Sequence, residues 1–213
     1  MKISVRGSAE RRYQAEVAIA HLAIAVQGPE RDEVLGRATQ AHTLVTEALA
    51  ELERAGHVAT WSADNVRVFA QRLWNPAIES TELTQTARLS VFGEFTDFEV
   101  LGRFLESVAG NEDVEVGGID WNVTPQNRVE YEAEIRHEAV LDAIAKAQAY
   151  ADAIGAGQVE ATHLSDPGML GSEPPMPRAM MAAMADSRAS GGFELVPAEI
   201  VVRADVDAHF KAH

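Results

Sequence analysis

The residues whose types and spacing suit chemistry are few, and the first group lies near the start of the longest predicted helix. Glu134 and His137 are three residues apart, which places a carboxylate and an imidazole on one helix face, and Glu130 and Glu138 lie within about one turn. One Glu-x-x-His motif is half of a di-iron carboxylate site, and no other predicted helix carries the matching half. We therefore interpret the group as an acidic, solvated helix start that the helix dipole favours.

A second candidate group lies at the C-terminus. Asp207, His209 and His213 carry the side chains that bind divalent metal ions. Chain ends are poorly ordered unless they are tied down. We expect a frayed terminus here, with metal binding as the alternative.

Methionines are concentrated in one segment, since five of the six fall between residues 169 and 184. Four of them, at i, i+4, i+5 and i+8, would share one face of a short helix: Met176, Met180, Met181 and Met184. Thioethers bind Cu(I) and also form adaptable protein-binding surfaces. The surrounding proline and glycine residues predict a flexible insert over residues 167–192. A protein contact within an oligomer and a copper site are the two alternatives.

Charge and cysteine content exclude several classes of function. The chain has 33 acidic against 18 basic residues, a net charge of -15, which disfavours nucleic acid as a partner. It has no cysteine, so disulfides, thiolate catalysis and cysteine-bound zinc are excluded. The apolar stretch from Val17 to Val26 is interrupted by His21 and is too short to span a membrane. Without an apolar leader we expect a cytoplasmic protein, or a periplasmic one if a signal peptide was removed. No cofactor motif is found.

Alternation and helical periodicity predict an α+β fold with an antiparallel-rich sheet packed by two long helices. Near the C-terminus, Ile200, Val202 and Ala204 alternate with polar residues, which indicates a half-buried strand in the same sheet as an N-terminal strand. Strands are predicted at residues 3–9, 13–27, 65–73, 84–95, 114–123, 159–164 and 199–210, and helices at 31–54, 96–108 and 128–154. We expect one domain over 1–213, with residues 86–124 as a possible β-α-β subdomain.

Several details of these elements are specific expectations. Both faces of the strand at 13–27 are largely apolar, which predicts a central position. Gly7 suggests a bulge in the first strand. The long helix is expected to bury Val140, Ile144 and Ile154 together with Ala147 and Ala151.

The order of these pieces resembles the SIMPL-domain family (domain of unknown function 541), which includes periplasmic-immunogen-like bacterial proteins. Three segments carry the resemblance: Ile3-Ser-Val-Arg-Gly-Ser-Ala-Glu10, the alanine-rich helix from Arg136 to Gly155, and the ending Pro197-Ala-Glu-Ile-Val-Val-Arg-Ala-Asp-Val-Asp207. The resemblance implies an α+β fold, frequent assembly into rings or larger oligomers, and no established enzyme activity or agreed catalytic residues. Many bacterial members carry a signal peptide, and the Met- and Pro-rich insert is a departure from the family pattern.

These observations predict a non-enzymatic, self-assembling interaction or structural protein, a homo-oligomer without a nucleic-acid partner or a membrane span. If the insert makes a protein contact, the alternative to a flexible loop, the methionines at 176, 180, 181 and 184 are the residues that would make it. A small-molecule or metal-binding protein is the alternative.

Overall fold

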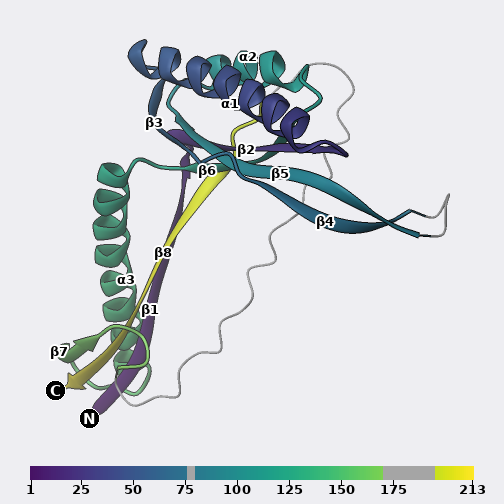
Figure 1. The fold of residues 1–213 in the computed structure, drawn as a ribbon. Coiled ribbons are helices and arrows are strands. Elements are labelled where there is room, and N and C mark those ends of the chain that lie inside the picture. Colours follow the sequence, from purple (N-terminus) through teal and green to yellow (C-terminus); the bar gives the residue numbers. More distant parts are fainter. Residues whose placement is uncertain (76–79, 170–194) are drawn as a thin grey trace. The chain divides into compact units, whose positions relative to one another are not determined.

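The computed structural model describes residues 1–75, 80–169 and 195–213, and these divide into two compact units (Figure 1). Unit 1 consists of the two ends of the chain, residues 1–14 and 199–213, together with residues 123–169. Unit 2 consists of residues 15–75, 80–122 and 195–198. The mixed α+β class with antiparallel sheets is confirmed, and each long helix packs on a separate sheet.

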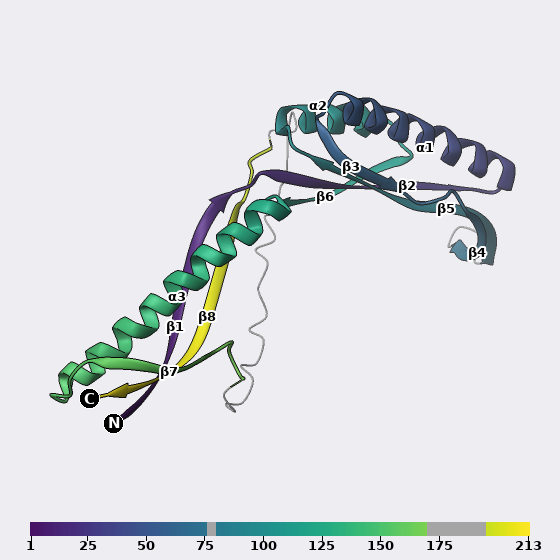
Figure 2. The same cartoon turned by 90° about the vertical axis from the view of Figure 1, so that its left-hand side faces the viewer.

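Unit 1 is a three-stranded antiparallel sheet with one long helix along it (Figure 2). The strands are β1 (Lys2–Gln14), β7 (Val159–Ser165) and β8 (Glu199–Ala212), in the order β1-β8-β7. The β1–β8 register runs without interruption from Lys2 opposite Lys211 to Gln14 opposite Glu199. This pairing confirms that the first and last strands share a sheet.

The helix of unit 1, α3 (Pro125–Ala153), buries small side chains. Its buried stripe is Ile135, Ala139, Ala143, Ala147 and Ala151. The prediction for Ala147 and Ala151 is confirmed, but Ile144 and Ile154 are 40% and 54% exposed and Val140 is only partly buried. Hydrophobicity favours the larger residues for the buried stripe, whereas the helix uses alanines to approach the sheet closely.

Gly7 explains this close approach. A Cβ atom at residue 7 would collide with the carbonyl oxygen of Ala139 and lie 2.7 Å from the Cβ of Ala143. The predicted bulge at Gly7 is wrong, because the register is regular on both sides of it. Glycine is required here because the helix backbone lies against the strand.

Unit 2 places two helices on one face of a larger sheet. Its strands are β2 (Val17–Gly28), β3 (Val58–Ala63), β4 (Val68–Asn75), β5 (Ser80–Phe95) and β6 (Val114–Asn122), and its helices are α1 (Arg31–Arg54) and α2 (Phe98–Ala109). The order is β3-β5-β2-β6, with β4 also paired to β5. The central position of β2 is confirmed, whereas β3 was not predicted.

The sequences of the two helices of unit 2 explain which residues α1 buries and where α2 begins. In α1 the buried residues are Val34, Ala38, Ala41, Val45 and Leu49, as the predicted stripe requires. Helix α2 begins after Asp97, whose carboxylate accepts hydrogen bonds from the backbone N–H groups of Glu99 and Val100. Strands β5 and β6 are both antiparallel to β2, so they run parallel to each other, and α2 is the crossover between them within residues 86–124.

Candidate functional site

Glu134 is a structural residue that connects α3 to β1. Its carboxylate accepts hydrogen bonds from the Arg11 guanidinium at 2.6 Å and the Tyr13 hydroxyl at 3.1 Å. Arg11 also pairs with Glu138, and the Tyr13 ring stacks on Tyr131 with centroids 3.7 Å apart. The hydrogen bonds from Arg11 and then Tyr13 hold the pKa of Glu134 below its ordinary value. Since Glu134 is held as a carboxylate by β1, it is not a proton donor at neutral pH.

His137 lies on the exposed side of α3. The Glu-x-x-His pair considered above as half of a di-iron site therefore has its two side chains in different surroundings, Glu134 bonded to β1 and His137 exposed. Across residues 1–75, 80–169 and 195–213, the structure brings no three His, Asp or Glu side chains together as a metal-binding group. The signal for the Glu134 contacts was the alternation that places Arg11 and Tyr13 on one face of β1.

The expected frayed C-terminus is wrong, because β8 is the central strand of its sheet and pairs through Ala212. Asp207 is 8% exposed and accepts hydrogen bonds from Arg6 Nε at 2.6 Å and from a second Arg6 nitrogen at 3.0 Å. The hydrogen bonds from Arg6 lower the pKa of Asp207 against the opposing effect of burial. His209 Nδ1 lies 2.7 Å from Ser4 Oγ, and His213 Nε2 lies 3.4 Å from Glu160.

Met176, Met180, Met181 and Met184 lie outside the described residues. The preceding turn is described, and Asp207 ties it to β8. Gly168 has a φ of +83°, and its N–H donates to the Asp207 carboxylate at 3.1 Å. Asp207 therefore orders both β1, through Arg6, and the turn that follows β7.

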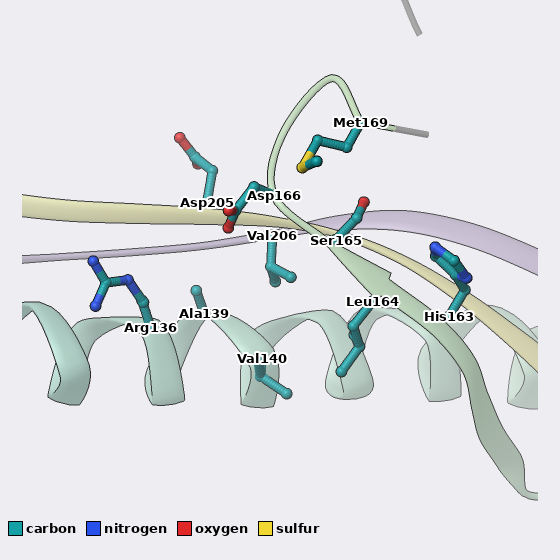
Figure 3. A pocket seen from close by; sticks show the side chains of 10 residues that line it. All are labelled: Arg136, Ala139, Val140, His163, Leu164, Ser165, Asp166, Met169, Asp205 and Val206. Carbon is teal, nitrogen blue, oxygen red and sulfur yellow. The ribbon is translucent and has the colours of Figure 1, made fainter. Parts of the chain in front are cut away.

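The same turn borders a cavity of about 630 Å³ that lies entirely in unit 1 (Figure 3). Side chains from α3, the end of β7 with its turn, and β8 line it. The apolar ones are Ala139, Val140, Leu164, Met169 and Val206, and the polar ones are Arg136, His163, Ser165, Asp166 and Asp205. Sequence reasoning missed this cavity because its lining residues come from three distant segments and form no motif.

The polar groups of the cavity differ in whether they already have hydrogen-bond partners. Arg136 donates to Glu132 at 2.8 Å, and Asp205 accepts from Arg203 at 3.1 Å. The hydroxyl oxygen of Ser165 is buried and has no hydrogen-bond partner among the described residues. An unsatisfied buried hydroxyl costs free energy. A molecule in the cavity would supply the missing hydrogen bond only after the side chains that cover this oxygen moved aside. The arrangement suits a small molecule with an apolar body and polar groups.

The two sheets, their covering helices and this cavity define an antiparallel α+β protein. A family model described as SIMPL, a protein of unknown function (DUF541), matches residues 3–210. The chain belongs to this family, and the match extends over both units. A search of curated proteins found no match. In the described part of the chain, no helix is both long and apolar enough to cross a membrane.

Proposed function

We propose that the protein is a self-assembling, non-enzymatic interaction or structural protein of the SIMPL type. The observation that carries this proposal is the two-stranded arm of unit 2, formed by β4 and the first part of β5. Strand β2 pairs with β5 only as far as Gly28 opposite Gln85, whereas β5 begins at Ser80. Beyond Gln85 the described partner of β5 is β4 alone. Two-stranded ribbons are marginally stable in water, so a partner that covers the arm would stabilise it.

Large apolar side chains are exposed on this arm and on the part of the sheet next to it. Phe69 is 49% exposed on β4 and Leu83 is 57% exposed on β5, and Phe92 further along β5 is 38% exposed. Strand β4 is paired on one side in the described residues, which leaves its other edge open to a further strand. A second copy of the chain is the occupant we propose, since the same open edge on two copies can pair about a twofold axis.

The test is the mass in solution of a variant carrying Phe69→Ser and Leu83→Ser. We expect the wild-type protein to be an oligomer and this variant to have a smaller mass by size-exclusion chromatography with light scattering. The matched control is Leu141→Ser, which removes a side chain that is 51% exposed on α3 of unit 1. A wild-type monomer at tens of micromolar, or an unchanged mass in a folded variant, contradicts the proposal.

The methionine-rich segment is a second proposed contact in the same assembly. Four of its five methionines, Met176, Met180, Met181 and Met184, supply soft apolar groups of the kind that form adaptable protein interfaces. Deleting residues 172–190 and joining the ends by a short Gly-Ser linker tests this contact. A smaller particle with the wild-type circular dichroism spectrum supports it, and an unchanged mass and thermal stability reject it.

The second candidate function is binding of a small molecule in the cavity of unit 1. The apolar side chains of Leu164 and Val206 beside the polar side chains of Arg136 and Asp205 favour it. Native mass spectrometry of the purified protein would detect a retained small molecule. Val206→Trp should fill the cavity and abolish retention of the molecule. The Phe69→Ser/Leu83→Ser variant should still retain it.

A further inference from the structure

Among the residues that the structure describes, strand β1 pairs with β8 on one edge and with no strand on its other edge. Met1 and Ala212 exchange backbone hydrogen bonds of 3.0 and 2.9 Å, so the odd-numbered residues of β1 pair with β8. The even-numbered residues therefore direct their N–H and C=O groups away from β8. Because the register is regular over all thirteen residues from Lys2 to Gln14, this edge is long and unbroken, which is the kind that accepts a further strand.

Two side chains of α3 occupy the middle of this edge. Asp142 Oδ2 accepts a hydrogen bond from the Ser8 N–H at 2.8 Å, and Lys146 Nζ donates to the Arg6 carbonyl at 3.1 Å. The two side chains are four residues apart on the helix and pair with each other at 2.6 Å. The hydrogen bond from Lys146 and then that from Ser8 lower the pKa of Asp142.

The close approach of α3 at Gly7 makes these contacts geometrically feasible. Gly7 lies between Arg6 and Ser8, and its missing side chain lets Ala139 and Ala143 lie against the strand. Asp142 and Lys146 then reach the edge groups on either side of Gly7. We call this pair the edge clasp.

We propose that the edge clasp closes β1 to strand addition by β1 of a second copy of this chain. The sequence of the edge is self-complementary when two antiparallel copies are centred on Ser8, because Arg6 then lies opposite Glu10 of the other copy. In that register the two Ser8 residues would exchange two backbone hydrogen bonds. The clasp holds the Ser8 N–H that this central pair needs. This inference concerns unit 1 and does not depend on the proposed arm interface of unit 2.

The test compares the mass of the wild-type protein with that of the double variant Asp142→Ala/Lys146→Ala. Opening the edge should at least double the wild-type particle mass at tens of micromolar. The matched control is Glu132→Ala/Arg136→Ala, which removes a second i,i+4 ion pair of α3, at 2.8 Å, whose two side chains bond to each other. The control should keep the wild-type mass.

A rescue variant identifies the edge that is used. Adding Ser8→Pro to the double variant removes the freed N–H without breaking a hydrogen bond to β8, since Ser8 faces the open edge. The rescued variant should return to the wild-type mass. The proposal is wrong if hydrogen exchange of the Ser8 amide becomes faster in the double variant while the particle keeps the wild-type mass. It is also wrong if the double variant gains mass and adding Ser8→Pro does not reverse the gain. If the double variant does not fold, Asp142→Ala alone carries the same expectation, and an unchanged mass would reject it.

Discussion

The backbone of Gly7 in β1 and the carbonyl oxygen of Ala139 in α3 lie in direct contact, with no room for a side chain between them. This contact sets the spacing of helix and sheet in unit 1. It explains why the buried stripe of α3 is mostly alanine, and it brings Asp142 and Lys146 within reach of the β1 edge.

Gly7→Ala should destabilise the protein by about 2 kcal/mol or more, because the new methyl group forces the helix away from the strand. Gly36 offers a matched control, since it lies on the exposed side of α1, a Cβ there would have no neighbour within 4 Å, and its φ is not positive. Gly36→Ala should raise stability by about 1 kcal/mol through helix propensity. Urea unfolding curves of the two variants give the comparison, and equal effects would show that the contact does not limit packing.

The sequence could predict elements whose signal is local. The apolar stripe of α1 and the two apolar faces of β2 were sufficient to place those elements. The prediction failed where contacts between distant residues decide the structure. Periodicity favours Ile144 over Ala143, because hydrophobicity carries no information about how closely a helix approaches a strand. The alternation near the C-terminus correctly predicted a strand in the sheet of the N-terminal strand. It did not predict that this strand is central and ordered through Ala212, because that depends on β7 pairing with its other edge.

Unit 1 should lose stability as the pH falls. Glu134, Asp142 and Asp207 all have a pKa below the ordinary value in the folded state. The unfolded chain therefore takes up protons first, so their contribution is present above the ordinary carboxylate pKa and is lost between about pH 5 and pH 2. Asp207→Asn should lower the thermal midpoint at pH 7. On acidification the midpoint of this variant should then fall less than that of the wild type. A parallel decline in variant and wild type would contradict this role of Asp207.

The aromatic residues allow the two units to be followed separately in that experiment. The three tyrosines, Tyr13, Tyr131 and Tyr150, lie in unit 1, and the three tryptophans, Trp61, Trp74 and Trp121, lie in unit 2. Tyrosine absorbance should report the acid-sensitive transition of unit 1, and tryptophan emission should report unit 2. Coincident midpoints at every pH would show that the units unfold together.

Asp97 should stabilise α2 as its N-terminal cap. Its carboxylate oxygen accepts from Glu99 N and Val100 N, both at 3.1 Å, and the hydrogen bond from Val100 is the largest cause of its lowered pKa. Asp97→Ala should cost about 1 kcal/mol of unit 2 stability, measured by tryptophan emission in urea. Glu30 stands at the same position of α1 without a side-chain cap hydrogen bond, so Glu30→Ala should have little effect. Equal losses in the two variants would exclude capping as the cause.

Ser165 should be a site where removing a hydroxyl does not reduce stability. Its buried oxygen has no partner in the described residues, so Ser165→Ala should leave stability unchanged or raise it by about 1 kcal/mol. Thr86 is the matched comparison, because it is 6% exposed and its hydroxyl accepts a hydrogen bond from Gln71 Nε2 at 3.0 Å. Thr86→Val should cost about 1 kcal/mol, since it leaves the Gln71 donor without that acceptor.

The direction of the Ser165→Ala effect also bears on the cavity. In protein freed of small molecules by unfolding and refolding, Ser165→Ala should leave stability unchanged or raise it, as stated above. In protein that retains a molecule bonded to Ser165, the same substitution should lower the thermal midpoint, because the ligand loses a partner. Identical shifts in the two preparations would show that no retained molecule depends on this hydroxyl.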